Sequence, residues 1–127
     1  MFQYTKAFSG FSVNDATAAA QFYGQTLGIG VEQGAMGLTL KLAGGGDVFV
    51  YPKDDHTPAT YTVLNFVVTD IDVAVDALAG KGVVFERYEA MHQDEKGVAR
   101  GIAAGQGPDI AWFKDPAGNV LAVLQEA

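Results

Sequence analysis

Few side chains in this sequence could perform acid–base chemistry, and they are widely spaced. The two histidines are His56, in the stretch KDDHTP, and His92, in the stretch HQDEKG. A histidine beside carboxylates can act as a general acid or base, or can bind a metal ion. Pro52 and Pro58 bracket the first stretch, which therefore predicts a solvated linker turn. We interpret His92 as a residue of a surface loop.

Nucleophilic chemistry has little support in the sequence. Cysteine is absent, which excludes disulfides, thiolate metal sites and cysteine nucleophiles. Ser9 and Ser12 lie outside any nucleophile-elbow pattern. The triplet Gly44-Gly45-Gly46 lacks the lysine and the following helix of a phosphate-binding loop, so it predicts a hairpin turn instead.

Composition and charge exclude several classes of partner. The 127 residues suit one domain, and 49% hydrophobic with 18% charged residues is typical of a globular protein. With a net charge of −7 and no basic cluster, we expect no nucleic-acid partner and no membrane partner. No apolar run of about 18 residues is present, and the N-terminal stretch lacks a signal-peptide pattern. These features, with the absence of cysteine, favour a cytoplasmic location.

The elements that must position any site follow an internal repeat. Residues 11–15, FSVND, match residues 66–70, FVVTD, at an offset of 55. The alternating apolar residues predict a strand in each copy, and Asp15 and Asp70 predict the N-caps of the helices that follow. The apolar stretches IGVEQ and VVFERY then predict a second strand in each copy.

Each copy closes with a hairpin, so each predicts the order β-α-β-β-β. The predicted hairpin strands are 38–42 and 47–51 in the first copy, and 110–113 and 119–125 in the second. The residues expected to face the sheets from the helices are Ala19, Phe22, Tyr23 and Leu27, then Val73, Leu78 and either Ala74 or Ala77.

The predicted domain is therefore one unit of two modules. Module one spans 1–52, a polar linker spans 53–59, and module two spans 60–127. Residues 89–108 form a long glycine-rich loop with a short strand at 98–102, and loops of that length are often functional or mobile.

A helix on one side of each sheet leaves the other face uncovered, and two such faces can curl into a cup. Strand alternation decides which side chains line it. The residues expected to face the cup are Phe8, Gly10 and Ser12 on the first strand, Val63, Asn65 and Val67 on its counterpart, and Val120, Ala122 and Leu124 on the last.

The pattern resembles the vicinal oxygen chelate superfamily, which includes glyoxalase I, extradiol dioxygenases and bleomycin resistance proteins. The stretches SVNDATAAAQFYGQTLGI, FVVTDIDVAVDALAGKGVVF and WFKDPAGNVLAVLQ carry the resemblance, which covers nearly the whole chain. It implies an α+β fold in which two βαβββ modules form a cup-shaped open barrel. The same fold supports many activities, so the resemblance implies no single reaction.

Enzymes of that superfamily usually hold a divalent metal in the cup, and the resemblance locates its four ligand positions. They are occupied here by Phe8, Val63, Ala122 and either Val50 or Tyr51. Phenylalanine, valine and alanine offer no oxygen or imidazole donor, and one tyrosine cannot hold a metal alone. We therefore expect no metal site and no cofactor.

The first functional hypothesis is a metal-free protein of the bleomycin-resistance type that binds a small apolar or aromatic molecule. An acidic chain would also attract a cationic ligand. Binders of this superfamily are often homodimers, which implies a homodimer here, with Trp112 and residues 89–108 at its interface. The candidate ligand-binding residues are Phe8, Ser12, Tyr51, Asn65, Arg87, Arg100 and Trp112.

Three alternatives remain open at this point. The apolar lining of the cup could simply be core, and Asn65 could serve a neighbouring strand, water or a partner chain instead of a ligand. The protein could be a glyoxalase-like lyase, isomerase or dioxygenase, using a displaced metal site near His56 and His92 or metal-free acid–base chemistry. It could also be a structural or regulatory partner protein with a filled cup.

Overall fold

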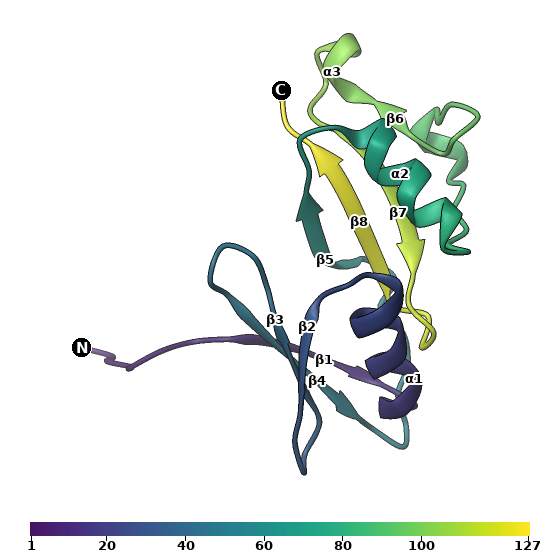
Figure 1. Ribbon diagram of the computed structural model, residues 1–127. Helices are drawn as coiled ribbons and strands as arrows, with labels where there is room; N and C mark the ends of the chain where they lie inside the picture. Colours follow the sequence, from purple (N-terminus) through teal and green to yellow (C-terminus); the bar gives the residue numbers. More distant parts are fainter. The chain divides into compact units, whose positions relative to one another are not determined.

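Each copy of the repeat forms its own four-stranded sheet in the computed structural model, which describes all of residues 1–127 (Figure 1). The chain divides into two units, Met1–Pro58 and Ala59–Ala127. No helix is long and apolar enough to cross a membrane.

The first unit contains four strands and one helical segment that ends in a wider turn. The strand order in sheet A is β1-β4-β3-β2, with β1 parallel to β4 and the other pairs antiparallel. Its elements are β1 (Ser9–Val13), α1 (Ala16–Gln21), the π-helical turn η1 (Phe22–Thr26), β2 (Gly30–Gln33), β3 (Leu38–Lys41) and β4 (Asp47–Pro52).

The second unit repeats this plan with a helix that is α-helical throughout and with additional short elements. The strand order in sheet B is β5-β8-β7-β6, again with a parallel first pair. Its elements are β5 (Thr62–Val67), α2 (Ile71–Gly80), the 3-10 turn η2 (Glu89–Met91), β6 (Ala99–Arg100), α3 (Gly101–Ala104), β7 (Asp109–Lys114) and β8 (Val120–Gln125). Both hairpins are confirmed, and the βαβββ order holds in both units, with β6 in place of the second strand predicted for module two.

Helix capping works identically in the two units, as the repeat predicts. The Asp15 carboxylate accepts hydrogen bonds from the backbone N–H groups of Thr17 and Ala18, at 2.9 and 3.1 Å. The Asp70 carboxylate accepts from the N–H groups two and three residues ahead, at 3.0 and 3.2 Å. These bonds satisfy donors that have no partner within a first helical turn, and so they fix where each helix begins.

The helices differ at their C-terminal ends. In η1 the Leu27 N–H donates to the carbonyl of Phe22, five residues earlier, so the last turn of the first helix is wider than an α-turn. Gly28 then adopts φ 73°, a left-handed conformation that glycine tolerates without strain. In the second unit Gly82 follows α2 with φ 91°.

The core of each unit lies between its helix and one sheet face. In the first unit Tyr23 is fully buried, and its ring lies 6.1 Å from that of Phe11 on β1. In the second unit Ile71 and Val75 of α2 are buried.

The prediction that Val73 faces the sheet is wrong, because Val73 is 64% exposed. The cap at Asp70 fixes the phase of α2, so residues 71 and 75 face the sheet and residue 73 lies on the opposite side. Ala74 is half-buried and Ala77 is exposed, which decides the alternative that the sequence left open.

The predicted strand in VVFERY does not form. Phe85 makes a single bridge to Phe113, and the Glu86 N–H donates to the carbonyl of Trp112 at 2.8 Å. Beyond that point the Gln93 side chain takes the place of a neighbouring strand. Its amide nitrogen donates to the Glu86 carbonyl at 2.7 Å, and its amide oxygen accepts from the Tyr88 N–H at 2.7 Å.

The segment 89–108 is also more ordered than a long loop. It contains η2, β6 and α3, and the predicted strand at 98–102 is reduced to two residues because Gly101 begins α3. Asp94 closes a turn by accepting from the N–H groups of Lys96 and Val98, both at 2.9 Å. Side-chain hydrogen bonds to the backbone therefore stabilise this segment.

Candidate functional site

The face of sheet A turned away from α1 carries a row of aromatic and polar side chains. Gly10 and Ser12 of β1 lie beside Phe49 and Tyr51 of β4, and Thr39 of β3 lies on the other side of Phe49. Adjacent residues in register share a face of a sheet, so these five side-chain positions form one surface, here termed the open face.

Three aromatic rings form the centre of this surface. The Phe49 ring stacks on Tyr51 with centroids 5.8 Å apart, and Phe8 meets Phe49 edge-on at 6.4 Å. Phe8 is 61% exposed, so its ring is available to a ligand. Gly37 leaves room for the Phe49 ring, since a Cβ at that position would lie 3.1 Å from its Cζ atom.

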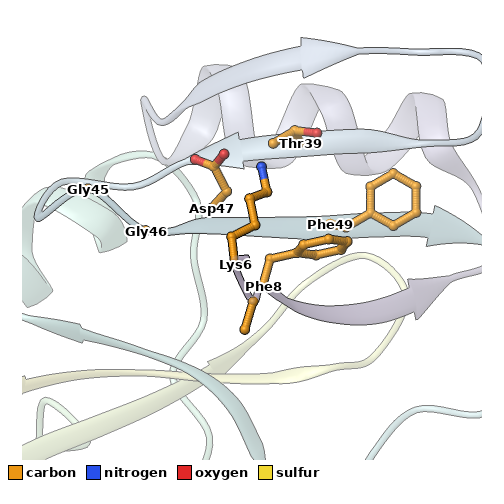
Figure 2. Close-up of a pocket in the computed structure, with 8 residues that line it drawn as sticks. Lys6, Phe8, Thr39, Gly45, Gly46, Asp47 and Phe49 are labelled. Atoms are coloured by element: carbon orange, nitrogen blue, oxygen red, sulfur yellow. The ribbon is translucent and has the colours of Figure 1, made fainter. Parts of the chain in front are cut away.

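A cavity of about 330 Å³ lies at one end of the aromatic rings (Figure 2). Phe8 and Phe49 form its apolar side, and Lys6, Thr39 and Asp47 supply polar groups. The glycine turn closes it through Gly45 and Gly46, whose lack of side chains leaves space. The cavity belongs entirely to the first unit; its lining residues are Lys6, Ala7, Phe8, Thr39, Gly45, Gly46, Asp47 and Phe49.

The charges around this cavity are partly paired. The Lys41 ammonium donates to the Asp47 carboxylate at 3.0 Å and lies 3.8 Å from Glu32. The hydrogen bond to Asp47 raises the pKa of Lys41 above its usual value. Lys6 forms neither an ion pair nor a hydrogen bond.

Ser12 and His56 form a polar pair at the other end of the open face. The Ser12 Oγ lies 2.7 Å from the His56 Nδ1, which is within hydrogen-bond distance. Both side chains are half-buried. The predicted solvated turn forms, with the His56 N–H donating to the Lys53 carbonyl at 3.0 Å, but the histidine side chain folds back onto β1, a contact that local sequence does not reveal.

The positions at which the fold's relatives carry metal ligands hold no donor set in this chain. The register pairs Gly10 with Phe49 and Asn65 with Ala122, so Phe49 is the first-unit equivalent of Ala122. Both alternatives from the sequence, Val50 and Tyr51, were wrong by one or two residues, and Val50 is fully buried on the helix side.

No group of three histidine, aspartate or glutamate side chains lies together in a way that could hold a metal ion. Carbon side chains at these positions do not fit a divalent cation, which requires oxygen or nitrogen donors.

In the second unit a bulky aromatic residue covers the corresponding position. Trp112 of β7 is the cross-strand partner of Ala122 and is 9% exposed, while Ala122 is fully buried. Tyr88 meets the Trp112 ring edge-on at 5.4 Å, and burial raises the pKa of its phenol. Ala99 and Val120 complete this cluster, which we term the tryptophan cluster. Its packing is that of a hydrophobic core.

The two arginines hold the chain between α2 and β7 in place. Arg87 donates to the backbone carbonyls of Asp94 and Glu95. Arg100 donates to Asp72 at 2.7 Å and to Asp94 at 2.9 Å. Hydrogen bonds from Arg100, and then from Lys96, lower the pKa of Asp72 to about 2.

Of the predicted ligand-binding residues, the structure brings three together. Phe8, Ser12 and Tyr51 lie along the open face of the first unit, whereas the other four belong to the second unit. There Asn65 is exposed on β5 beside Ala122. His92 is exposed and takes a left-handed conformation with φ 48°.

Sequence reasoning missed four residues around the cavity. Phe49 could have been found from the repeat together with the strand pairing. The offset of 55 relates Gly10 to Asn65, and Phe49 pairs with Gly10 as Ala122 pairs with Asn65. Lys6, Thr39 and Asp47 carried no sequence signal, because only the fold places the residues before β1 beside the hairpin.

Comparison with solved structures identifies the fold. A member of the glyoxalase/bleomycin resistance protein/dioxygenase superfamily from Sphaerobacter thermophilus is 23% identical with a TM-score of 0.67, covering 96% of this chain and 98% of its own. TnmS3, an antibiotic binding protein from Streptomyces sp. CB03234, is 21% identical with a TM-score of 0.67, covering 99% and 100%. The fosfomycin resistance protein FosX from Listeria monocytogenes is 12% identical with a TM-score of 0.69, covering 99% and 96%.

No protein-family model matches the sequence, and no curated protein sequence matches it. The structural similarity extends over nearly the whole chain, and it confirms the glyoxalase/bleomycin resistance-like fold that the resemblance implied. At these identities the similarity concerns the fold alone.

Proposed function

We propose that this protein binds a small apolar or aromatic molecule on the open face of its first unit, without a catalytic metal. The observation that carries the proposal is the continuous surface of Phe8, Phe49 and Tyr51 beside a cavity of about 330 Å³. Aromatic rings with a few polar groups in a concave site are typical of small-molecule recognition.

Several further observations support a binding role. Side chains without donor atoms occupy the positions where metal-dependent relatives bind their ion, and the tryptophan cluster fills the space near Ala122. TnmS3, which has the same fold, is described as an antibiotic binding protein. Ser12 and Tyr51 would contact the ligand together with Phe8, all three from the first unit. The homodimer and the cytoplasmic location remain predictions.

The test begins with the metal content of protein purified without chelators, followed by thermal-shift measurements with divalent ions. A stoichiometric metal would overturn the proposal. A thermal-shift screen of aromatic compounds should then give a saturable rise in melting temperature, since a ligand stabilises the state to which it binds.

Matched variants connect any binding to the proposed surface. Phe8 and Tyr61 are exposed aromatic residues of different units, at 61% and 70% exposure. Phe8→Ala should abolish most of the ligand-induced shift, and Tyr61→Ala should leave it unchanged. Equal loss in both variants, or in neither, would argue against binding at the open face.

The Ser12–His56 pair favours one second candidate, an enzyme using metal-free acid–base chemistry. A half-buried imidazole 2.7 Å from a hydroxyl can accept its proton. An active-site-directed fluorophosphonate would label Ser12 under this hypothesis, and His56→Gln would suppress the labelling without unfolding the protein. Absence of labelling at Ser12 would remove this candidate.

A further inference from the structure

The cavity beside the glycine turn contains an ammonium group without an ion-pair partner, in a chain whose net charge is negative. The protein carries a net charge of −7, which alone would favour a cationic ligand. At the cavity, however, the Asp47 carboxylate is already paired with the Lys41 ammonium at 3.0 Å. Lys6 lines the same cavity and makes no ion pair, so its ammonium is available to an anionic ligand, although Lys6, Lys41, Asp47 and Glu32 together carry no net charge.

The backbone of the turn adds to the same preference. Within it, the Gly45 N–H donates to the Leu42 carbonyl, and the Leu42 N–H donates to the Gly46 carbonyl. The Gly46 N–H makes no such bond. Gly46 also lines the cavity, where the absence of a side chain would let a ligand approach the backbone closely (Figure 2).

The opposite side of the cavity is aromatic. Phe8 and Phe49 meet edge-on at 6.4 Å, and Phe8 is 61% exposed. An aromatic ring placed against these two residues would gain area burial and ring–ring contacts. At about 330 Å³, the cavity is near the lower limit of ligand pockets, which suits a molecule with one or two rings.

We infer that the ligand of this cavity is a small aromatic acid, whose ring contacts Phe8 and Phe49 and whose carboxylate binds the Lys6 ammonium beside the glycine turn. The inference rests on the proposed binding function and adds the chemical class of the ligand. The sequence alone does not indicate an anionic ligand, because its only electrostatic feature is the net negative charge of the chain.

Three probes with the same ring system separate the possibilities. The full-length protein is titrated calorimetrically with 2-naphthoate, 2-naphthylmethylamine and 2-naphthalenemethanol at low ionic strength. The acid should bind about tenfold more tightly than the alcohol, because a hydrogen bond to a charged group is stronger than one between neutral groups. The amine should bind most weakly, and added salt should weaken only the binding of the acid.

Variants at two positions test the assignment of the charge. Lys6→Met should reduce the affinity for 2-naphthoate to about that of the alcohol, and Lys6→Arg should retain most of it, because the charge is preserved. Lys6 is exposed, so neither change should affect folding. Asp47→Asn should strengthen binding of the acid, because it removes the nearest negative charge and frees the Lys41 ammonium.

The outcomes distinguish this inference from the function on which it rests. Preferential binding of the amine or the alcohol would overturn the aromatic-acid assignment and leave the proposed binding function intact. An undiminished affinity of the Lys6→Met variant for 2-naphthoate would overturn the role of Lys6. Failure of all three probes, together with no hit in the wider aromatic screen, would overturn both.

Discussion

The Ala122→Glu substitution should severely destabilise the second unit, because the position is core and not an emptied metal site. Ala122 is fully buried, and its neighbour across the strands is Trp112. Keeping a glutamate side chain neutral there at pH 7 costs roughly 4 kcal/mol, because its pKa must rise from the ordinary value to about 7. Overpacking adds about 1–3 kcal/mol. The total approaches the full stability of a typical domain, about 5–15 kcal/mol.

Urea denaturation followed by tryptophan fluorescence measures this effect directly, since Trp112 is the only tryptophan and touches the substituted position. Ala122→Gln is the matched control, because it has the size of glutamate without the charge. The difference between the two variants should be large at pH 7. It should shrink as the pH falls below the ordinary glutamate pKa, where the carboxyl is neutral in both the folded and unfolded states.

A different result would refute this account of the position. If Ala122→Glu folded with near-normal stability and bound a divalent ion, Trp112 would have to move aside readily. The tryptophan cluster would then be a displaceable cover over a metal-binding position.

Four other substitutions have definite expected outcomes. The pKa of Asp72 is lowered to about 2 by Arg100 and Lys96. Its ion pairs therefore stabilise the fold above the ordinary aspartate pKa and cease to do so as the pH falls toward 2, so the melting temperatures of wild type and Asp72→Asn should converge in acid. Gly37→Ala should destabilise the first unit by more than about 1 kcal/mol, because the added Cβ would lie 2.5 Å from the Val50 carbonyl oxygen. Gly80→Ala in α2 has open space around it and should stabilise the second unit by about 0.5–1 kcal/mol in the same denaturation assay. Asn65→Leu should change the unfolding free energy in that assay by no more than about 0.5 kcal/mol, because Asn65 is exposed.

The fold was largely predictable because its signals are local and occur twice. Each capping aspartate fixes the start of a helix through bonds to residues two and three positions ahead, and strand alternation before it fixes the inward face. The secondary-structure predictions failed where a side chain outside the predicted strand makes the backbone hydrogen bonds that a neighbouring strand would otherwise make. The stretch VVFERY has the composition of a strand, yet the Gln93 side chain takes the hydrogen bonds that a neighbouring strand would have made.

The candidate site was only partly predictable for a related reason. Phe8 and Ser12 follow from alternation on the first strand, whereas Tyr51 came from the ligand positions that the resemblance implied. His56 and Lys6 do not, because each lies outside a regular element and reaches the open face only through the tertiary path of the chain. Their types alone suggested a solvated turn and a scattered surface charge.

The π-helical turn η1 has a consequence for how the two halves of the chain correspond. Gly28 follows Asp15 by thirteen residues, whereas Gly82 follows Asp70 by twelve. A helix with one additional residue would rotate everything after it by about 100° if it continued as a regular α-helix. The wider turn, with its bond from Leu27 to Phe22, absorbs the additional residue locally. The first unit thus accommodates a one-residue difference in length between the two helical segments within a single turn, without disturbing the strands on either side.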